Sequence, residues 1–148
     1  PEFEAVVRLG ATMDYVVDIA TPDAKAAADL RPLANSALYL ASIRERFNAP
    51  SDPWTASVLL FHDRHWEEPI LIDSLASDQF YIGALGSRRT HQARREHLSA
   101  LGYEGGQIDR ITGPIGVIPQ ARDPATLALS VMTEIALRRR DADKKFSS

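Results

Sequence analysis

The segment from Phe80 to His91 has the clearest pattern for chemistry in this chain. It reads FYIGALGSRRTH, so an apolar strand enters a turn with two glycines and leaves through a serine into a helix. Glycines permit tight or positive-φ backbone, and the free N–H groups and dipole of a helix start favour an anion. A serine hydroxyl and bidentate arginines could complete a phosphate site. The candidate cofactor-binding residues of this segment are Gly83, Gly86, Ser87, Arg88 and Arg89. The alternative is that the glycines only allow close packing of strand and helix, with both arginines facing solvent.

Asp18 is a second candidate, for the ribose of a nucleotide. It is expected to close a buried strand over residues 13–19, where an acidic residue commonly binds a ribose hydroxyl in dinucleotide-binding folds. The alternative is that an aspartate at a strand end reflects ordinary turn chemistry. A GxGxxG fingerprint would lie just before Pro1, so we expect a chain truncated at its N-terminus.

His62 and Asp63, with His65 close by, follow the most apolar strand of the chain, SVLLFH at 57–62. They could form a proton relay or supply metal ligands. Alternatively, Asp63 caps the next helix and His62 orients the turn. The local spacing offers no third metal ligand, and no nucleophile lies beside a base, so we predict neither a metal site nor a catalytic residue.

Other charged side chains are assigned to helix surfaces. Glu67 and Glu68 are expected to favour the first turn of a helix electrostatically. A basic helix face is expected to be solvated, with an acidic partner or an anionic ligand as the alternative, and comprises His91, Arg94, Arg95 and His97.

These residues must be positioned by alternating helices and strands. Hydrophobic periodicity and capping residues predict helices over 4–11, 24–30, 67–76, 87–101 and 124–140, a helical turn over 108–111, and strands over 13–19, 36–41, 57–62, 79–82 and 115–118. The strand at 36–41 could also be helical, and the strand at 57–62 is expected to be central in its sheet. This alternation predicts an α/β fold: a Rossmann-like, doubly wound, mostly parallel sheet with helices on both faces. Ligands of such sheets bind beyond the carboxyl ends of the strands.

Composition narrows the class of protein. With 148 residues, of which 45% are hydrophobic, the chain suits one domain over 1–140 with a frayed polar tail at 141–148. A net charge of -3 disfavours binding to nucleic acid or to an anionic membrane. The absence of cysteine excludes disulfides and thiol chemistry in this segment and fits the cytoplasm. No apolar run approaches the roughly 20 residues of a membrane span.

The block at 80–91 is similar to F-Y-[IV]-G-A-L-G-S-R-R-T-H, a segment typical of the XdhC/CoxI family, and so long a match in order is specific. Further similarities extend over essentially the whole chain. Asp18 after YVV resembles the family's V-V-D strand end, and LLFHD at 59–63 resembles V-L-T-H-D with Phe61 in place of threonine. ITGPI at 111–115 resembles I-x-x-P-I-G, and ARDPATLALSVMTE at 121–134 resembles A-[RK]-[TS]-P-x-E-I-A-[VL]-S-I-x-A-E.

The resemblance implies a C-terminal Rossmann domain, preceded by a separate domain in many members, of an accessory protein for molybdenum hydroxylases. Such a protein binds the molybdenum cofactor, as molybdopterin or its dinucleotide form, protects it during sulfuration with a cysteine desulfurase, and delivers it to an apoenzyme such as xanthine dehydrogenase. A homodimer is also expected. The glycine turn would then hold the phosphate and Asp18 the ribose, with His62 and Asp63 as the nearest polar groups.

One loop departs from the family pattern. Where the family usually has G-L-D-I-G-A, residues 116–121 read GVIPQA, so an acidic residue and a glycine are missing beside the expected crevice. We expect a changed ligand or a weakened site. The rival function is an NAD(P)-dependent oxidoreductase that uses the same crevice, with His62 as its candidate acid or base. A structural or dimerising domain whose site has decayed is a third hypothesis.

Overall fold

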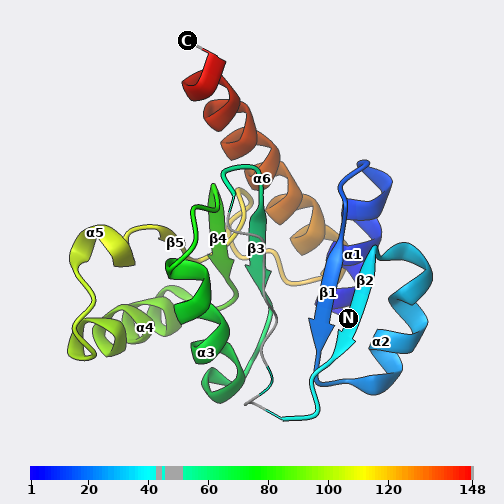
Figure 1. Cartoon of the computed structure of the whole chain (residues 1–148), viewed down its shortest axis with the longest axis horizontal. Helices are drawn as coiled ribbons and strands as arrows, with labels where there is room; N and C mark the ends of the chain where they lie inside the picture. Colours follow the sequence, from blue (N-terminus) through cyan, green and yellow to red (C-terminus); the bar gives the residue numbers. More distant parts are fainter. Residues whose placement is uncertain (43–44, 46–51, 148) are drawn as a thin grey trace. The chain divides into compact units, whose positions relative to one another are not determined.

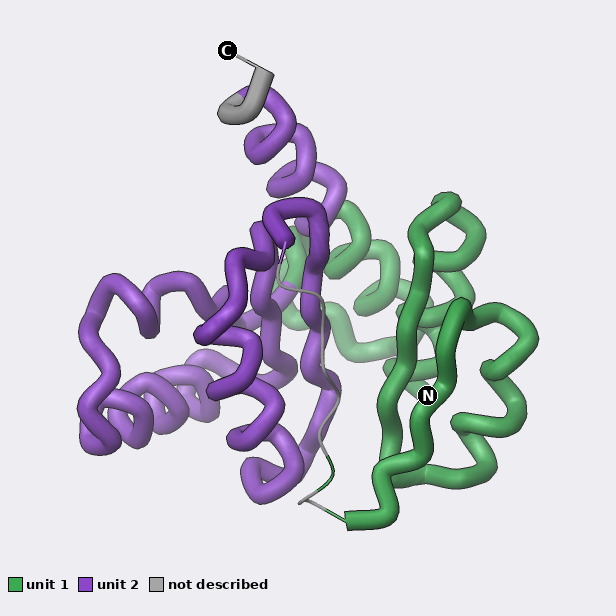
Figure 2. The backbone as a smooth tube through the Cα atoms, viewed as in Figure 1, with its two compact units in different colours: residues 1–47, 116–133 green, residues 48–115, 134–148 purple. Residues whose placement is uncertain are grey.

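The computed structural model describes residues 1–42, 45 and 52–147, which form an α/β chain with parallel strands (Figure 1). The chain divides into two compact units, Pro1–Phe47 with Gly116–Thr133 and Asn48–Ile115 with Glu134–Ser148 (Figure 2). The α/β class and the parallel pairing predicted from the sequence are confirmed.

The first unit begins with helix α1 (Glu2–Thr12), strand β1 (Asp18–Thr21), helix α2 (Ala24–Leu30), the 3-10 turn η1 (Arg31–Leu33) and strand β2 (Ser36–Tyr39). β1 and β2 pair in parallel, with Asp18 opposite Ser36. The Asp23 side chain accepts hydrogen bonds from the N–H groups of Lys25 at 3.0 Å and Ala26 at 3.1 Å, which starts α2 where the sequence predicts. Val7, Ile19 and Leu30 form the core between these elements.

The strand containing Asp18 differs from its prediction. β1 begins at Asp18, whereas the sequence predicted that the strand ends near this residue. Asp18 therefore lies at the amino end of a parallel strand. Ligands of parallel sheets bind at the opposite, carboxyl end, so the positional argument for a ribose contact is lost.

The second unit contains strand β3 (Ala56–Leu59), helix α3 (Arg64–Leu75), strand β4 (Tyr81–Ala84), helix α4 (Arg88–Ala100), the short helix α5 (Gly105–Ile108) and strand β5 (Ile111–Thr112). The strand order is β3-β4-β5 and every pairing is parallel. One core joins side chains of the strands to side chains of α3, α4 and α5: Leu59, Leu71, Leu75, Ile82, Ala84, Leu98, Ile108 and Ile111. Successive residues of a strand face opposite sides of the sheet, so Tyr81 and Gly83 lie on the other face of β4, where Gly83 is close to Ile115.

Three predictions for the strands are wrong in this unit. β4, and not β3, is the middle strand, and each of its residues is buried. β4 also begins later than predicted, so Gly83 lies inside the strand and not in the following turn. The last strand is Ile111–Thr112, at the place of the expected helical turn, and residues 115–118 form no strand.

Helix α6 (Pro124–Ser147) closes the chain. It continues past residue 140, where the sequence predicts its end, and Ser148 of the predicted tail lies outside the described residues. In the second unit the Tyr81 hydroxyl donates a 2.7 Å hydrogen bond to Glu134 Oε1 of this helix. Burial and the neighbouring carboxylate raise the pKa of Tyr81, so its hydroxyl remains a donor.

Among the described residues, every helix is too short or too polar to traverse a lipid bilayer.

Gly83 is required in β4 because of close packing. A Cβ atom at Gly83 would lie 2.6 Å from Tyr81 Oη and 2.8 Å from Ile115 Cγ2, and Tyr81 is fully buried. We expect Gly83→Ala to lower the free energy of unfolding by about 1 to 3 kcal/mol, the usual cost of overpacking a core. Urea titration would measure this, with Gly106→Ala as control because a Cβ at Gly106 meets no atom within 4 Å. Equal stability of the two variants would contradict the packing argument.

Candidate anion-binding site

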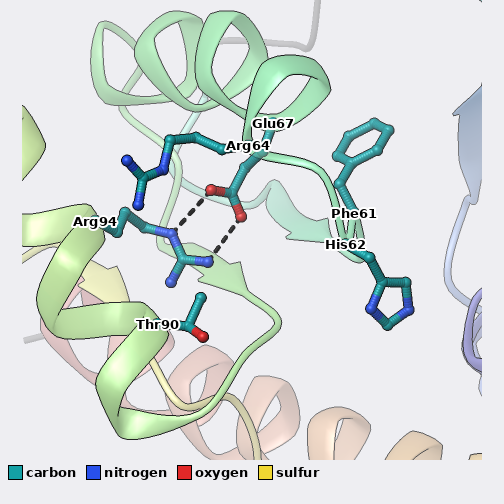
Figure 3. Close-up of a pocket in the computed structure, with 6 residues that line it drawn as sticks. All are labelled: Phe61, His62, Arg64, Glu67, Thr90 and Arg94. Atoms are coloured by element: carbon teal, nitrogen blue, oxygen red, sulfur yellow. Dashed lines mark hydrogen bonds and ion pairs between the residues drawn. The ribbon is translucent and has the colours of Figure 1, made fainter.

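A pocket of about 160 Å³ lies in the second unit, between the start of α3 and the start of α4. Its lining residues are Phe61, His62, Arg64, Glu67, Thr90 and Arg94 (Figure 3). Arg64 is the first residue of α3, and Thr90 belongs to the first turn of α4. The positive ends of two helix dipoles therefore border one small pocket, which favours an anion.

The turn before α4 has the geometry expected of an anion site. Gly86 has a φ of 143°, which side chains rarely allow. Ser87 is the N-cap, and its Oγ accepts a 3.1 Å hydrogen bond from the N–H of Thr90. In the part of the chain that the structure describes, the backbone N–H groups of Arg88 and Arg89 have no partner, and both side chains are exposed. Two further donors are thus available beside two cationic side chains.

A buried ion pair between helices α3 and α4 contacts this turn. Arg94 of α4 contacts Glu67 of α3 in bidentate fashion, with Nε 3.0 Å from Oε2 and Nη2 2.8 Å from Oε1. The two side chains are only 5% and 6% exposed. Nη2 also donates a 2.8 Å hydrogen bond to the carbonyl oxygen of Leu85, the residue before Gly86. Figure 3 shows the carboxylate and the guanidinium facing each other. The expectation of a solvated Arg94 is wrong. Glu67 does lie in the first turn of its helix, as predicted, and its carboxylate additionally pairs with Arg94.

His91 completes this buried cluster. Its ring is 8% exposed and lies against Gly113. Burial, followed by the charges of Arg94 and Arg95, lowers the pKa of His91 to about 4. The ring is therefore neutral near pH 7, and Nδ1 accepts a 3.0 Å hydrogen bond from Arg94 Nη1, since a guanidinium can only donate. The solvated basic face predicted for α4 is wrong at His91 as well.

The remaining basic residues of α4 lie nearer the surface. Arg95 Nη2 is 2.6 Å from Asp109 Oδ1, and Asp109 is 67% exposed. His97 Nε2 lies 3.1 Å from Glu68 Oε2, a contact that is an ion pair only when the imidazole is protonated. Arg95 and His97 are partly exposed, so they agree with the predicted basic surface better than the buried Arg94 and His91 do.

His62 and Asp63 have different positions at this pocket. His62 lines the pocket, and its exposed ring points away from Glu67 and Arg94 in Figure 3. Asp63 is the N-cap of α3, and its Oδ1 accepts a 2.8 Å hydrogen bond from the N–H of His65. The capping alternative for Asp63 is therefore confirmed. The described residues contain no group of three or more histidine, cysteine or acidic side chains placed to hold a metal ion.

Two predicted site residues do not belong to the start of α4. Gly83 lies in β4 and packs against Tyr81. Asp18 belongs to the other unit, where its Oδ1 accepts hydrogen bonds from Asn35 Nδ2 at 3.0 Å and Ser36 Oγ at 2.8 Å. The structure thus brings together Gly86, Ser87, Arg88 and Arg89 of the predicted set.

Comparison with known proteins identifies the family. Residues 2–135 match the family described as the XdhC Rossmann domain. The chain belongs to this family.

One relative and one solved structure of similar fold are informative for this XdhC domain. It is 45% identical over 89 residues to the molybdenum cofactor insertion chaperone PaoD of Escherichia coli strain K12, a match that covers 60% of this chain and 28% of the relative. The crystal structure of a xanthine dehydrogenase from Bacillus halodurans superposes with a TM-score of 0.75 at 19% identity, covering 95% of this chain and 40% of that one. At this identity the second match shows the fold alone. The chain spans less than a third of its curated relative.

The loop that departs from the usual XdhC sequence keeps a glycine-like backbone. Gly116 has a φ of 98°, and Ser130 Oγ accepts a 2.8 Å hydrogen bond from the N–H of Ile118. Gln120 stands where the family pattern has its second glycine, and its φ is 56°. The left-handed conformation that glycine would adopt without strain is therefore retained with a glutamine side chain.

Proposed function

We propose that this XdhC domain binds the molybdenum cofactor and takes part in the maturation of a molybdenum hydroxylase of the xanthine dehydrogenase type. The observation that carries the proposal is the 45% identity to a molybdenum cofactor insertion chaperone. Family membership over residues 2–135 supports it. The activity of the whole protein is part of the proposal, because the chain covers only 28% of that relative.

The start of α4 is the proposed place for the cofactor's phosphate. The N–H groups of Arg88 and Arg89, their exposed guanidinium groups and the nearby Arg64 supply donors and positive charge. A pocket of about 160 Å³ suits a phosphate group, whereas pockets for whole cofactor-sized ligands measure roughly 300 to 1,000 Å³. The residues present therefore fit the phosphate, and the pterin ring would extend outside this pocket.

In this proposal the cofactor supplies the redox chemistry of the mature hydroxylase, and the domain supplies binding and orientation. The α4 start offers two arginines, a capping serine and backbone donors, and Arg64 lines the pocket beside it, a combination that suits a carrier of an anion. Sulfuration with a cysteine desulfurase, insertion into the apoenzyme and a homodimeric state belong to the proposal and rest on the family resemblance.

Replacement of Arg88 tests the phosphate site. We expect Arg88→Ala to bind molybdenum cofactor about tenfold more weakly, a loss of about 1.4 kcal/mol, because a charge-assisted contact to phosphate is removed. Anaerobic calorimetric titration would measure this. Arg95→Ala is the matched control, since it removes an arginine of the same helix that already contacts Asp109.

Parallel titrations with NADH and NADPH separate the proposal from its rival. Cofactor binding that weakens in Arg88→Ala and not in Arg95→Ala supports the accessory role. Tight NAD(P)H binding without affinity for molybdenum cofactor would instead indicate the oxidoreductase, and His62→Ala would be tested next. Binding of neither ligand would contradict both hypotheses.

A further inference from the structure

We propose that the buried pair Glu67–Arg94 is a clamp that positions the Leu85–Gly86–Ser87 turn for anion binding, so that Arg94 is a positioning residue and not a phosphate ligand. This inference rests on the proposed function of the α4 start and assigns a role within that site. Arg94 is an obvious candidate for a direct ligand, because it is an arginine that lines the pocket. Its hydrogen bonds argue against that role.

The charge of Arg94 is already matched. Its guanidinium donates to both carboxylate oxygens of Glu67, to the Leu85 carbonyl and to His91 Nδ1. A bidentate carboxylate at 2.8 and 3.0 Å occupies the edge with which arginine usually binds phosphate. A phosphate could use that edge only by displacing Glu67, which would leave a buried carboxylate without its partner.

The turn is held from two sides at Leu85. Its carbonyl oxygen accepts from Arg94, and its N–H donates a 2.9 Å hydrogen bond to the carbonyl oxygen of Leu59 in β3. Because the peptide group is planar, fixing the Leu85 carbonyl also fixes the N–H of Gly86. The next residue, Ser87, caps α4. Glu67, by orienting the guanidinium, thus determines where the first donors of the helix lie.

A purely stabilising ion pair is the competing explanation, and one double variant separates the two. Glu67→Leu combined with Arg94→Met replaces the pair with apolar side chains of similar size. Such replacements of buried ion pairs often preserve stability. The double variant also leaves the net charge unchanged, so a loss of anion binding would not come from a weaker long-range field. It removes the hydrogen bond to Leu85.

The first measurement is amide hydrogen exchange in the ligand-free full chain. We expect the Leu85 and Thr90 amides to exchange at least about tenfold faster in the double variant, with little change in the thermal midpoint, because the turn opens locally. Unchanged exchange at these amides would overturn the clamp, whatever the protein binds. If the double variant does not fold, Arg94→Lys serves instead, since one ammonium retains the charge but cannot hold Glu67 and Leu85 together as a guanidinium does.

The second measurement is titration with inorganic phosphate, followed by the amide resonances of residues 86–90. Wild type is expected to show saturable shifts there, with Arg95→Ala as control, and the folded variant is expected to bind at least about tenfold more weakly. Equal affinity in wild type and variant would overturn the clamp. A wild type without phosphate-dependent shifts would instead contradict the proposed anion site, while the exchange rates would still decide whether Arg94 holds the turn.

Discussion

Replacing either Glu67 or Arg94 alone with alanine should lower the free energy of unfolding by about 3 to 5 kcal/mol. Each side chain is about 95% buried, and each is the principal charge partner of the other. Removing one partner leaves the second charge in the protein interior without compensation, which is far more costly than loss of an exposed ion pair. Urea titration followed by circular dichroism would measure the change.

The neighbouring arginine provides the control for this expectation. Arg95→Ala removes a contact to the exposed Asp109 and should change stability by less than about 1 kcal/mol. The double variant Glu67→Ala with Arg94→Ala should cost less than the sum of the two single changes, because neither charge is left alone. Single variants no less stable than Arg95→Ala would show that the pair is not a buried ion pair in solution.

Local sequence signals predicted the elements around the site well. Asp23 and Ser87 mark helix starts that the structure confirms, since an N-cap depends only on the next few residues. The positive φ of Gly86 likewise follows from a glycine between a strand and a helix. The family resemblance, carried by the block at 80–91, is confirmed by the match over residues 2–135.

The buried polar cluster was missed, although a periodic signal was present. Residues 91, 94 and 98 share one face of α4, and Leu98 marks that face as buried. Glu67 likewise shares one face of α3 with the buried residues Leu71 and Leu75. Composition suggested a solvated surface, because isolated charges are rarely buried. Only the long-range pairing of two helices shows that these two charges meet inside the protein.

Strand boundaries were the weakest predictions, for a physical reason. Parallel strands are fixed by partners distant in sequence, and periodicity within a run of apolar residues cannot locate their ends. Asp18 and Gly83 show the consequence, since a shift of a few residues moved Asp18 to the start of β1 and Gly83 into β4. Both lost the positions on which their proposed ligand contacts depended.

Acid should destabilise this protein through His91. The pKa of His91 is lowered in the folded state to about 4, against about 6.5 in an unfolded chain, so the unfolded state binds the extra proton between these values. Stability is then fully present above pH 6.5 and is lost as the pH falls toward 4. At about 1.4 kcal/mol per pKa unit, the contribution lost between pH 7 and pH 5 is about 2 kcal/mol.

Comparison with His91→Gln isolates this contribution from that of the carboxylates. Glutamine stays neutral throughout the range, and its side-chain oxygen can accept from Arg94 as His91 Nδ1 does. Free energies of unfolding from urea titrations at pH 7, 6 and 5 should therefore fall more steeply for wild type than for the variant, with the difference growing to about 2 kcal/mol at pH 5. Parallel pH dependences would mean that His91 protonates equally readily in the folded protein, and that the Arg94 contact does not keep its ring neutral.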